Sequence, residues 1–184
     1  LVSVPGGTLY KGSNAFWLID GNIFPKPAGR GGFALHTPAA AEREVARRDI
    51  EIGSREITDP AARLRDLDLR SVEVQVVYPT LFIIYLTDDV DLEVALCRAY
   101  NRWMSHVWDA SHNRLRWPVV LPLHSIDESI KEMRKAKKHG AVGVFLRGLE
   151  GDRSVADPYF FPIYEEASSL GLPLCIHTGA GSPR

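Results

Sequence analysis

The hydrophobic positions of this chain alternate between helix-like and strand-like spacing from Asp59 onward. Between residues 88 and 113, apolar side chains recur every three or four positions, which predicts one long helix with a single buried stripe. Four other runs are almost continuously apolar, as is typical of strands: 72–78, 115–123, 141–146 and 172–176. A helical pattern separates each run from the next.

Short polar motifs mark the ends of the predicted helices. Asp59-Pro60 and Asp157-Pro158 each combine a capping side chain with a proline suited to the first helical turn. Ser125 with Glu128 forms a capping box, in which each side chain is expected to bond the other residue's backbone amide. Gly140 supplies the left-handed residue that ends this helix.

Strands that do not alternate between apolar and polar residues are buried on both faces, which is typical of parallel sheets covered by helices. The order of elements therefore predicts an α/β fold. The pattern fits either a barrel or a doubly wound open sheet.

The first 58 residues are broken by glycine and proline, and only 15–19 has the pattern of a strand. A short helix is predicted from Thr37-Pro38 to Arg48. We therefore divide the chain into an irregular lead-in or inserted segment, 1–58, and an α/β domain, 59–184. The chain starts with Leu1 and ends just after an apolar run, so we expect a piece of a longer protein.

Composition narrows the function classes. The chain has 184 residues, 45% of them hydrophobic, and a net charge of −1, which gives no broad electrostatic reason to bind nucleic acid or an anionic membrane. Its longest apolar stretch, 76–86, falls short of the roughly 20 residues of a membrane span. Cys97 and Cys175 lie among apolar residues and are expected to be buried free thiols, which favours a cytoplasmic location.

The carboxyl ends of parallel strands meet on one side of a sheet or barrel, and functional residues gather there. This rule selects Tyr78, His124 with Ser125, Arg147 and His177. His177 is the candidate metal ligand, because a neutral imidazole at a rigid strand end suits zinc or a similar divalent ion. The alternative for His177 is a hydrogen bond to a neighbouring backbone carbonyl.

Arg147 and His124 are candidate substrate-binding residues, each with a structural alternative. The planar guanidinium of Arg147 suits a substrate carboxylate, but Glu150 or Asp152 offers an internal partner. His124 directly precedes the capping residue Ser125, which favours local packing.

From about Ala61 to its end, the chain resembles the amidohydrolase-related family, the branch of the metal-dependent amidohydrolase superfamily that includes aminocarboxymuconate-semialdehyde decarboxylase and aromatic-acid decarboxylases. The matching motifs include Val119-Val-Leu-Pro-Leu, Gly140-Ala-Val-Gly-Val, Asp157-Pro-Tyr-Phe, Tyr164-Glu-Glu-Ala and Leu172-Pro-Leu-Cys-Ile-His-Thr-Gly. Their order and spacing, more than any single motif, carry the resemblance.

The resemblance implies a distorted (β/α)8 barrel of which this chain holds about strands 2–5. It also implies that His177 is the metal ligand that closes the fifth strand. The family's other ligands, an acidic-x-His or His-x-His pair on the first strand and an Asp on the eighth that would act as general base, have no match in this chain. Asp20 to Phe24 has the outline of that first strand without its histidines, but fits better in the inserted segment.

We therefore expect part of a hydrolase in which a divalent metal ion, expected to be zinc, activates water against a small carboxylate-bearing substrate. One alternative is a metal-dependent decarboxylase of the same family. A third, from a different class, is an α/β binding module that holds no metal. A homo-oligomer is compatible with each of them.

Overall fold

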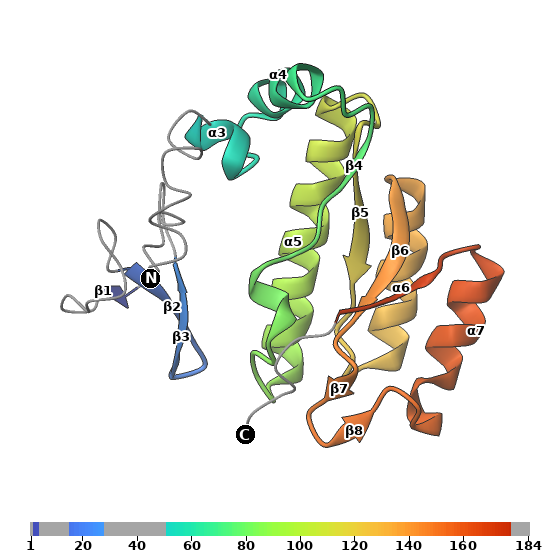
Figure 1. Cartoon of the computed structure of the whole chain (residues 1–184). Helices are drawn as coiled ribbons and strands as arrows, with labels where there is room; N and C mark the ends of the chain where they lie inside the picture. The colour runs from blue at the N-terminus through green and yellow to red at the C-terminus, as the bar shows by residue number, and fades with distance from the viewer. Residues whose placement is uncertain (1, 4–14, 28–50, 178–184) are drawn as a thin grey trace. The chain divides into compact units, whose positions relative to one another are not determined.

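The computed structural model describes residues 2–3, 15–27 and 51–177. Contacts within the chain divide it into two compact units, Leu1–Val72 and Glu73–Arg184, which we describe separately (Figure 1). The helix predicted from Thr37 to Arg48 lies outside the described residues.

The first unit contains a small antiparallel sheet in the order β1 (Val2–Ser3), β2 (Ala15–Ile19) and β3 (Asn22–Pro27). Strand β2 has the predicted bounds. Asp20 and Gly21 have φ values of 50° and 72°, which suit a two-residue hairpin turn between β2 and β3. The stretch from Asp20 to Phe24 is therefore a turn and the start of a hairpin strand.

Helices α3 (Ile52–Arg55) and α4 (Pro60–Leu69) also belong to this unit. The Asp59 side chain caps α4 as predicted, accepting from the Ala62 amide at 3.1 Å. The Asp59 amide in turn donates to the Gly53 carbonyl at 3.1 Å, which ties the two helices together. Contacts therefore group α3 with α4, whereas the sequence-based division between residues 58 and 59 separates them.

The second unit is a parallel sheet with helical crossovers. Its strands, in spatial order, are β4 (Gln75–Val76), β5 (Leu115–Val120), β6 (Ala141–Leu146) and β9 (Leu174–Ile176). The crossover helices are α5 (Val90–Ala110), α6 (Ile126–Lys138) and α7 (Phe161–Ser169). The spatial order of these strands follows their order along the chain, without the reversal that defines a doubly wound sheet. The strands are therefore neighbouring strands of a barrel wall, and the predicted partial barrel is confirmed.

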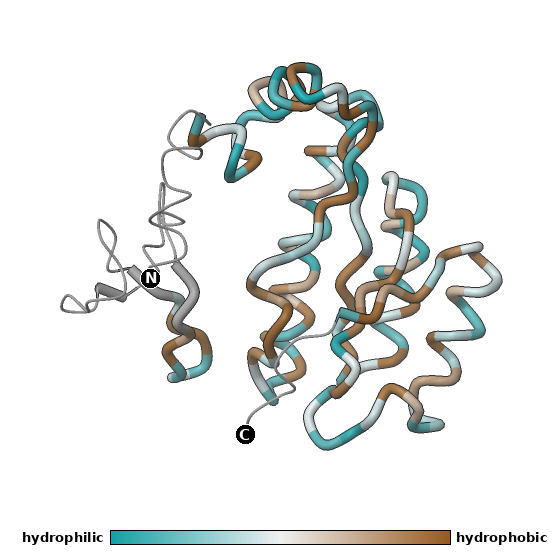
Figure 2. Tube along the Cα trace, viewed as in Figure 1, coloured by the Kyte–Doolittle hydropathy of each residue, from teal (hydrophilic) through white to brown (hydrophobic). Residues whose placement is uncertain are grey.

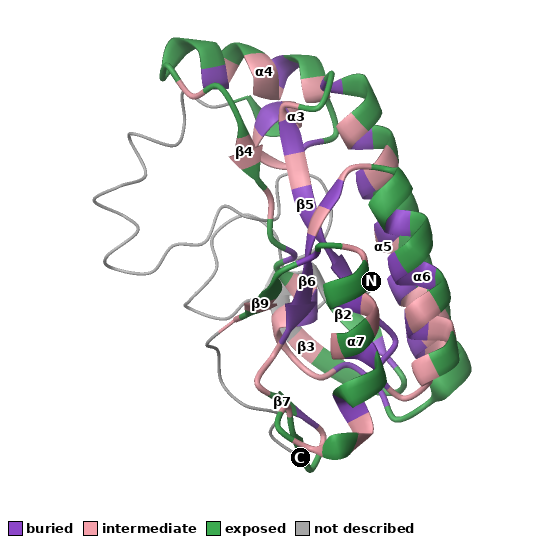
Figure 3. Cartoon of the chain, turned by 90° about the vertical axis from the view of Figure 1, so that its right-hand side faces the viewer, coloured by how far each residue is buried: buried purple, intermediate pink, exposed green. Residues whose placement is uncertain are grey.

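The core of this unit lies between the sheet and its helices. Figure 3 shows α5 and α6 along one side of β5 and β6, and α6 packs against both α5 and α7. Brown and teal alternate along the turns of the helices in Figure 2, so each helix has an apolar face. Trp117 of β5 is fully buried, and its indole N–H donates to the His139 carbonyl at 3.3 Å. Asn101 of α5 bonds both the N–H and the C=O of Val120.

The predicted helix ends are found, with one exception. The Ser125 hydroxyl accepts from the Glu128 amide at 3.4 Å. The reverse bond of the capping box is not observed among the described residues, because the Glu128 carboxylate pairs with Arg98 and with Lys131 at 2.8 Å. The cations beside Glu128 draw its side chain away from the helix start.

Four short elements connect the main ones: η1 (Leu81–Ile83), β7 (Leu149–Glu150), β8 (Arg153–Ser154) and η2 (Pro158–Phe160). The first lies between β4 and α5, and the other three lie between β6 and α7. Across the described part of the chain, no helix combines the length and the apolar character that membrane spanning requires.

Gly140, which follows the C-cap of α6, is predicted to tolerate no side chain. Its φ is +84°, and an added Cβ would lie 2.3 Å from the Trp108 ring. Gly171 has a φ of +61°, but an added Cβ would have no atom within 4 Å, so Gly171→Ala introduces backbone strain without a steric clash. We expect Gly140→Ala to lower the free energy of unfolding by about 2–4 kcal/mol and Gly171→Ala by about 1 kcal/mol. Urea denaturation followed by circular dichroism measures both, and equal losses would contradict the close contact with Trp108.

Candidate functional site

The carboxyl ends of the barrel strands carry two groups of side chains. The first surrounds His177, whose amide donates to the Leu146 carbonyl at 2.8 Å and extends the β6–β9 pairing by one residue. The imidazole lies 5.9 Å from the Phe145 ring and 6.5 Å from the Tyr78 ring, measured between centroids. Tyr78 and His177 therefore converge as predicted, although they follow β4 and β9, at opposite ends of the strand order.

The Nδ1 atom of His177 is buried and has no hydrogen-bond partner among the described residues. The predicted alternative, a bond from the ring to a backbone carbonyl, is thus not made at this nitrogen. A buried polar atom without a partner costs free energy, so such an atom in a stable protein points to a ligand or donor.

Beside His177, Cys175 and Tyr78 add two polar side chains. A hydrogen bond to the Cys175 thiol, together with burial, raises the pKa of Tyr78, so its phenol stays neutral at physiological pH. Gly143 makes room for Cys175, since an added Cβ would lie 2.6 Å from its Sγ.

His177 is a potential metal donor, and so is the thiol of the neighbouring Cys175. The described residues contain no group of three or more His, Cys, Asp or Glu side chains that could hold a metal ion. His177 therefore fits a metal as one ligand, and the remaining donors of such a site must come from elsewhere.

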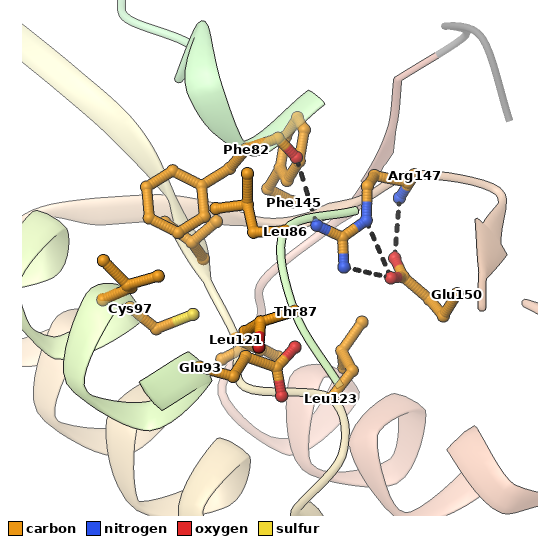
Figure 4. Close-up of a pocket in the computed structure, with 12 residues that line it drawn as sticks. Phe82, Leu86, Thr87, Glu93, Cys97, Leu121, Leu123, Phe145, Arg147 and Glu150 are labelled. Carbon is orange, nitrogen blue, oxygen red and sulfur yellow. Dashed lines mark hydrogen bonds and ion pairs between the residues drawn. The ribbon is translucent and has the colours of Figure 1, made fainter. Parts of the chain in front are cut away.

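The second group centres on Arg147, which follows β6. Its Nε donates to Glu150 Oε2 at 2.8 Å, its Nη2 also pairs with Glu150, and its Nη1 donates to the Phe82 carbonyl at 3.3 Å (Figure 4). The same Nη1 donates to the Ile84 carbonyl at 3.1 Å. The side chains of Arg147 and Glu150 are only 11% and 6% exposed. Because internal acceptors occupy this guanidinium, the substrate-binding role of Arg147 stays a prediction, and its structural alternative is the arrangement observed.

His124 follows β5 and lies in a chain of hydrogen bonds. Its Nδ1 lies 2.9 Å from Glu93 Oε2, which also accepts from the His124 amide at 3.0 Å. Its Nε2 lies 2.6 Å from Tyr85 Oη, and that hydroxyl donates to Asp88 Oδ1 at 2.6 Å. The Glu93 carboxylate is the main cause that raises the pKa of His124.

Tyr85 joins the two predicted substrate-binding residues. It bonds His124, and the Arg147 guanidinium lies 5.7 Å from the centroid of its ring. No sequence pattern singles out Tyr85 or Glu93. Tyr85 lies in a loop without a motif, and Glu93 lies in the first turn of α5, where an acidic residue is also expected simply to favour the helix dipole.

Comparison with known proteins identifies the family of this chain. The amidohydrolase family profile matches residues 24–184, and the chain belongs to this family. A curated relative, 2-amino-3-carboxymuconate-6-semialdehyde decarboxylase of Dictyostelium discoideum, is 27% identical over 122 residues, covering 65% of this chain and 33% of that protein.

Two solved structures have the same barrel fold. The 2,6-dihydroxybenzoate decarboxylase from Rhizobium matches with a TM-score of 0.59 at 19% identity, over 66% of this chain and 40% of that one. The 5-carboxyvanillate decarboxylase from Novosphingobium aromaticivorans, solved with bound manganese, matches with a TM-score of 0.59 at 19% identity, over 65% of this chain and 35% of that one. The chain thus spans between a third and two fifths of the length of these relatives.

Proposed function

We propose that this chain contributes part of the active site of a metal-dependent carboxy-lyase, with His177 as one ligand of a divalent ion. The observation that carries the proposal is the buried, unpartnered Nδ1 of His177 at the carboxyl end of a barrel strand. Imidazole is a ligand for zinc and for several other divalent ions. Zinc is the ion we expect first, and the manganese bound in a related decarboxylase makes manganese the second to test.

The expected substrate is a small molecule that carries a carboxylate. Decarboxylation is favoured over the hydrolysis expected from sequence, because the curated relative and two structural relatives are named decarboxylases of carboxylated compounds. Hydrolysis is the second candidate, supported by the family description itself. When bound, the ion would polarise the substrate's oxygen groups or, for hydrolysis, acidify water to a pKa of about 7.

The residues of this chain would bind and orient the substrate. The rings of Tyr78 and Phe145 both lie near the His177 ring and near each other, with 6.4 Å between their own centroids. The neutral phenol of Tyr78, 44% exposed in this structure, can donate its one proton to a substrate oxygen in place of the Cys175 thiol. These aromatic side chains also reduce the access of water to the ligand.

The test is the metal content of the protein expressed from its complete reading frame. We expect about one equivalent of zinc or manganese in the parent, and at least a tenfold weaker metal affinity in His177→Ala, since a lost ligand leaves an open coordination position. His106→Ala, which removes an exposed histidine of α5, is the matched control and should bind metal like the parent. A parent without stoichiometric metal would overturn the proposal and favour the binding-module alternative.

Products then separate the two reactions. Release of CO₂ from carboxylated aromatic or muconate-type compounds indicates a carboxy-lyase, whereas cleavage of an amide, ester or lactone indicates a hydrolase. Metal binding combined with hydrolysis alone would reject the carboxy-lyase assignment and keep the metal site.

A further inference from the structure

The hydrogen bonds around His124 are all satisfied by one arrangement of protons. Tyr85 Oη carries a single proton and donates it to Asp88 Oδ1. The 2.6 Å contact between the same oxygen and His124 Nε2 therefore needs a proton on the nitrogen. On the other side of the ring, the Glu93 carboxylate can only accept, so Nδ1 also carries a proton. This geometry is that of an imidazolium.

A neutral His124 cannot keep every contact. If Nε2 loses its proton, Tyr85 must donate either to His124 or to Asp88. The other contact then brings two acceptors to 2.6 Å, which is repulsive. Deprotonation therefore weakens the attachment of Tyr85, while Glu93 still holds the ring through Nδ1.

Tyr85 belongs to the segment 81–88, which connects β4 to α5 at the carboxyl-end face of the barrel. Phe82, Leu86 and Thr87 of this segment are buried, and polar contacts from two residues that follow strands also hold it. Arg147 binds the carbonyls of Phe82 and Ile84, and His124 binds Tyr85. Arginine keeps its charge at all physiological pH values, so only the attachment at His124 titrates.

We propose that His124 is a positioning residue of the barrel's carboxyl-end face: its doubly protonated ring holds Tyr85, and with it the segment 81–88, and releases them on deprotonation. The attachment follows from the contacts of His124 with Glu93 and Tyr85 and of Tyr85 with Asp88. Its consequence for substrate binding rests on the proposed function.

Charged and titratable groups face His124 from every neighbouring element: Glu93 of α5, Tyr85 and Asp88 of the β4–α5 connection, Arg147 and Glu150 after β6, and Arg153 of β8. Glu93 and Asp88 favour the imidazolium, whereas burial and Arg147 oppose it, and the net effect raises the pKa of His124 above 6.5. Because the folded-state value is the higher one, the attachment stabilises the fold fully below about pH 6.5 and is lost as pH rises through the folded-state value.

The first test measures the ring directly. Nitrogen-15 NMR of the histidine side chains should show both nitrogens of His124 protonated at pH 6, with a midpoint above 6.5. The Cζ resonance of Tyr85 should shift with the same midpoint. A neutral His124 at pH 6, or a Tyr85 resonance that does not follow the titration, would overturn the proposal without the need for any variant.

The second test measures the segment. In the parent, the rate of proteolysis within 81–88 should rise about tenfold from pH 6 to pH 9, relative to His124→Gln at each pH. The glutamine side chain can form hydrogen bonds but does not ionise. The proteolysis rate of His124→Gln should therefore change with pH only as far as the activity of the protease itself changes. His106→Gln, the matched control, should behave like the parent. A parent and His124→Gln with the same pH profile would overturn the proposal.

The third test measures the pH dependence of KM and kcat for the metal-loaded protein expressed from the complete reading frame. KM should rise with the midpoint of the His124 titration in the parent, kcat should change less, and the rise should be absent in His124→Gln. If the NMR and proteolysis results hold but the protein has no activity, the proposed function fails and the attachment stands. If activity is present and KM ignores the titration, the positioning role is rejected.

Discussion

Replacing Arg147 with methionine is expected to lower the free energy of unfolding by about 3–5 kcal/mol. The reason is Glu150, whose side chain is 6% exposed and whose carboxylate accepts two bonds from this guanidinium. Methionine matches the aliphatic part of arginine and leaves Glu150 charged without its partner. The variant also leaves the carbonyls of Phe82 and Ile84 without their donor. Urea unfolding of the parent and the variant measures the loss.

The double variant Arg147→Met with Glu150→Gln separates the ion pair from simple packing. Glutamine is neutral, and its oxygen can still accept from the residue 147 amide, as Glu150 Oε1 does at 3.1 Å. Removing the stranded charge should therefore recover about 2 kcal/mol relative to Arg147→Met alone. A double variant less stable than the single one would show that the unpaired carboxylate is not the main cost.

The strands and helices of the second unit could be predicted because their periodicity agrees with their burial. The run 141–146 has the bounds of β6. Three polar residues that precede apolar helical patterns, Asp89, Ser125 and Asp157, are the N-caps of helical elements, as expected. The run 72–78 gives only the two residues of β4, since Val72 instead donates its amide to Leu67 at the end of α4. Strand β3 was missed because Pro25 and Pro27 argue against a strand.

Only those site residues could be predicted from the sequence that directly follow a parallel strand, because the topology of the sheet brings the strand ends together. The rule that strand ends converge selects Tyr78 and His177, whose rings are neighbours in the structure. It also selects His124 and Arg147 but not their partners, because Glu93 and Tyr85 reach them from a helix and a loop. No sequence period records such contacts between distant segments. Whether Arg147 binds an internal acceptor such as Glu150 or a substrate carboxylate likewise depends on distances in the folded chain, which the sequence does not record.

Trp117→Ala is expected to cost about 3–5 kcal/mol, because it empties the largest fully buried side-chain volume in the described part of the chain. Trp103→Ala is the matched control. Both indoles meet the Tyr100 ring edge-on, with centroids at 6.5 Å for Trp117 and 5.7 Å for Trp103, but Trp103 is 38% exposed and should cost about 1 kcal/mol. Urea unfolding of both variants provides the comparison, and equal losses would show that the aromatic contact outweighs burial.

Trp117 lies in the first half of β5, whereas His124 follows its carboxyl end. The titration midpoint of His124 should therefore stay unchanged in Trp117→Ala wherever the variant remains folded, which separates the stability of the barrel wall from the electrostatics of its carboxyl-end face.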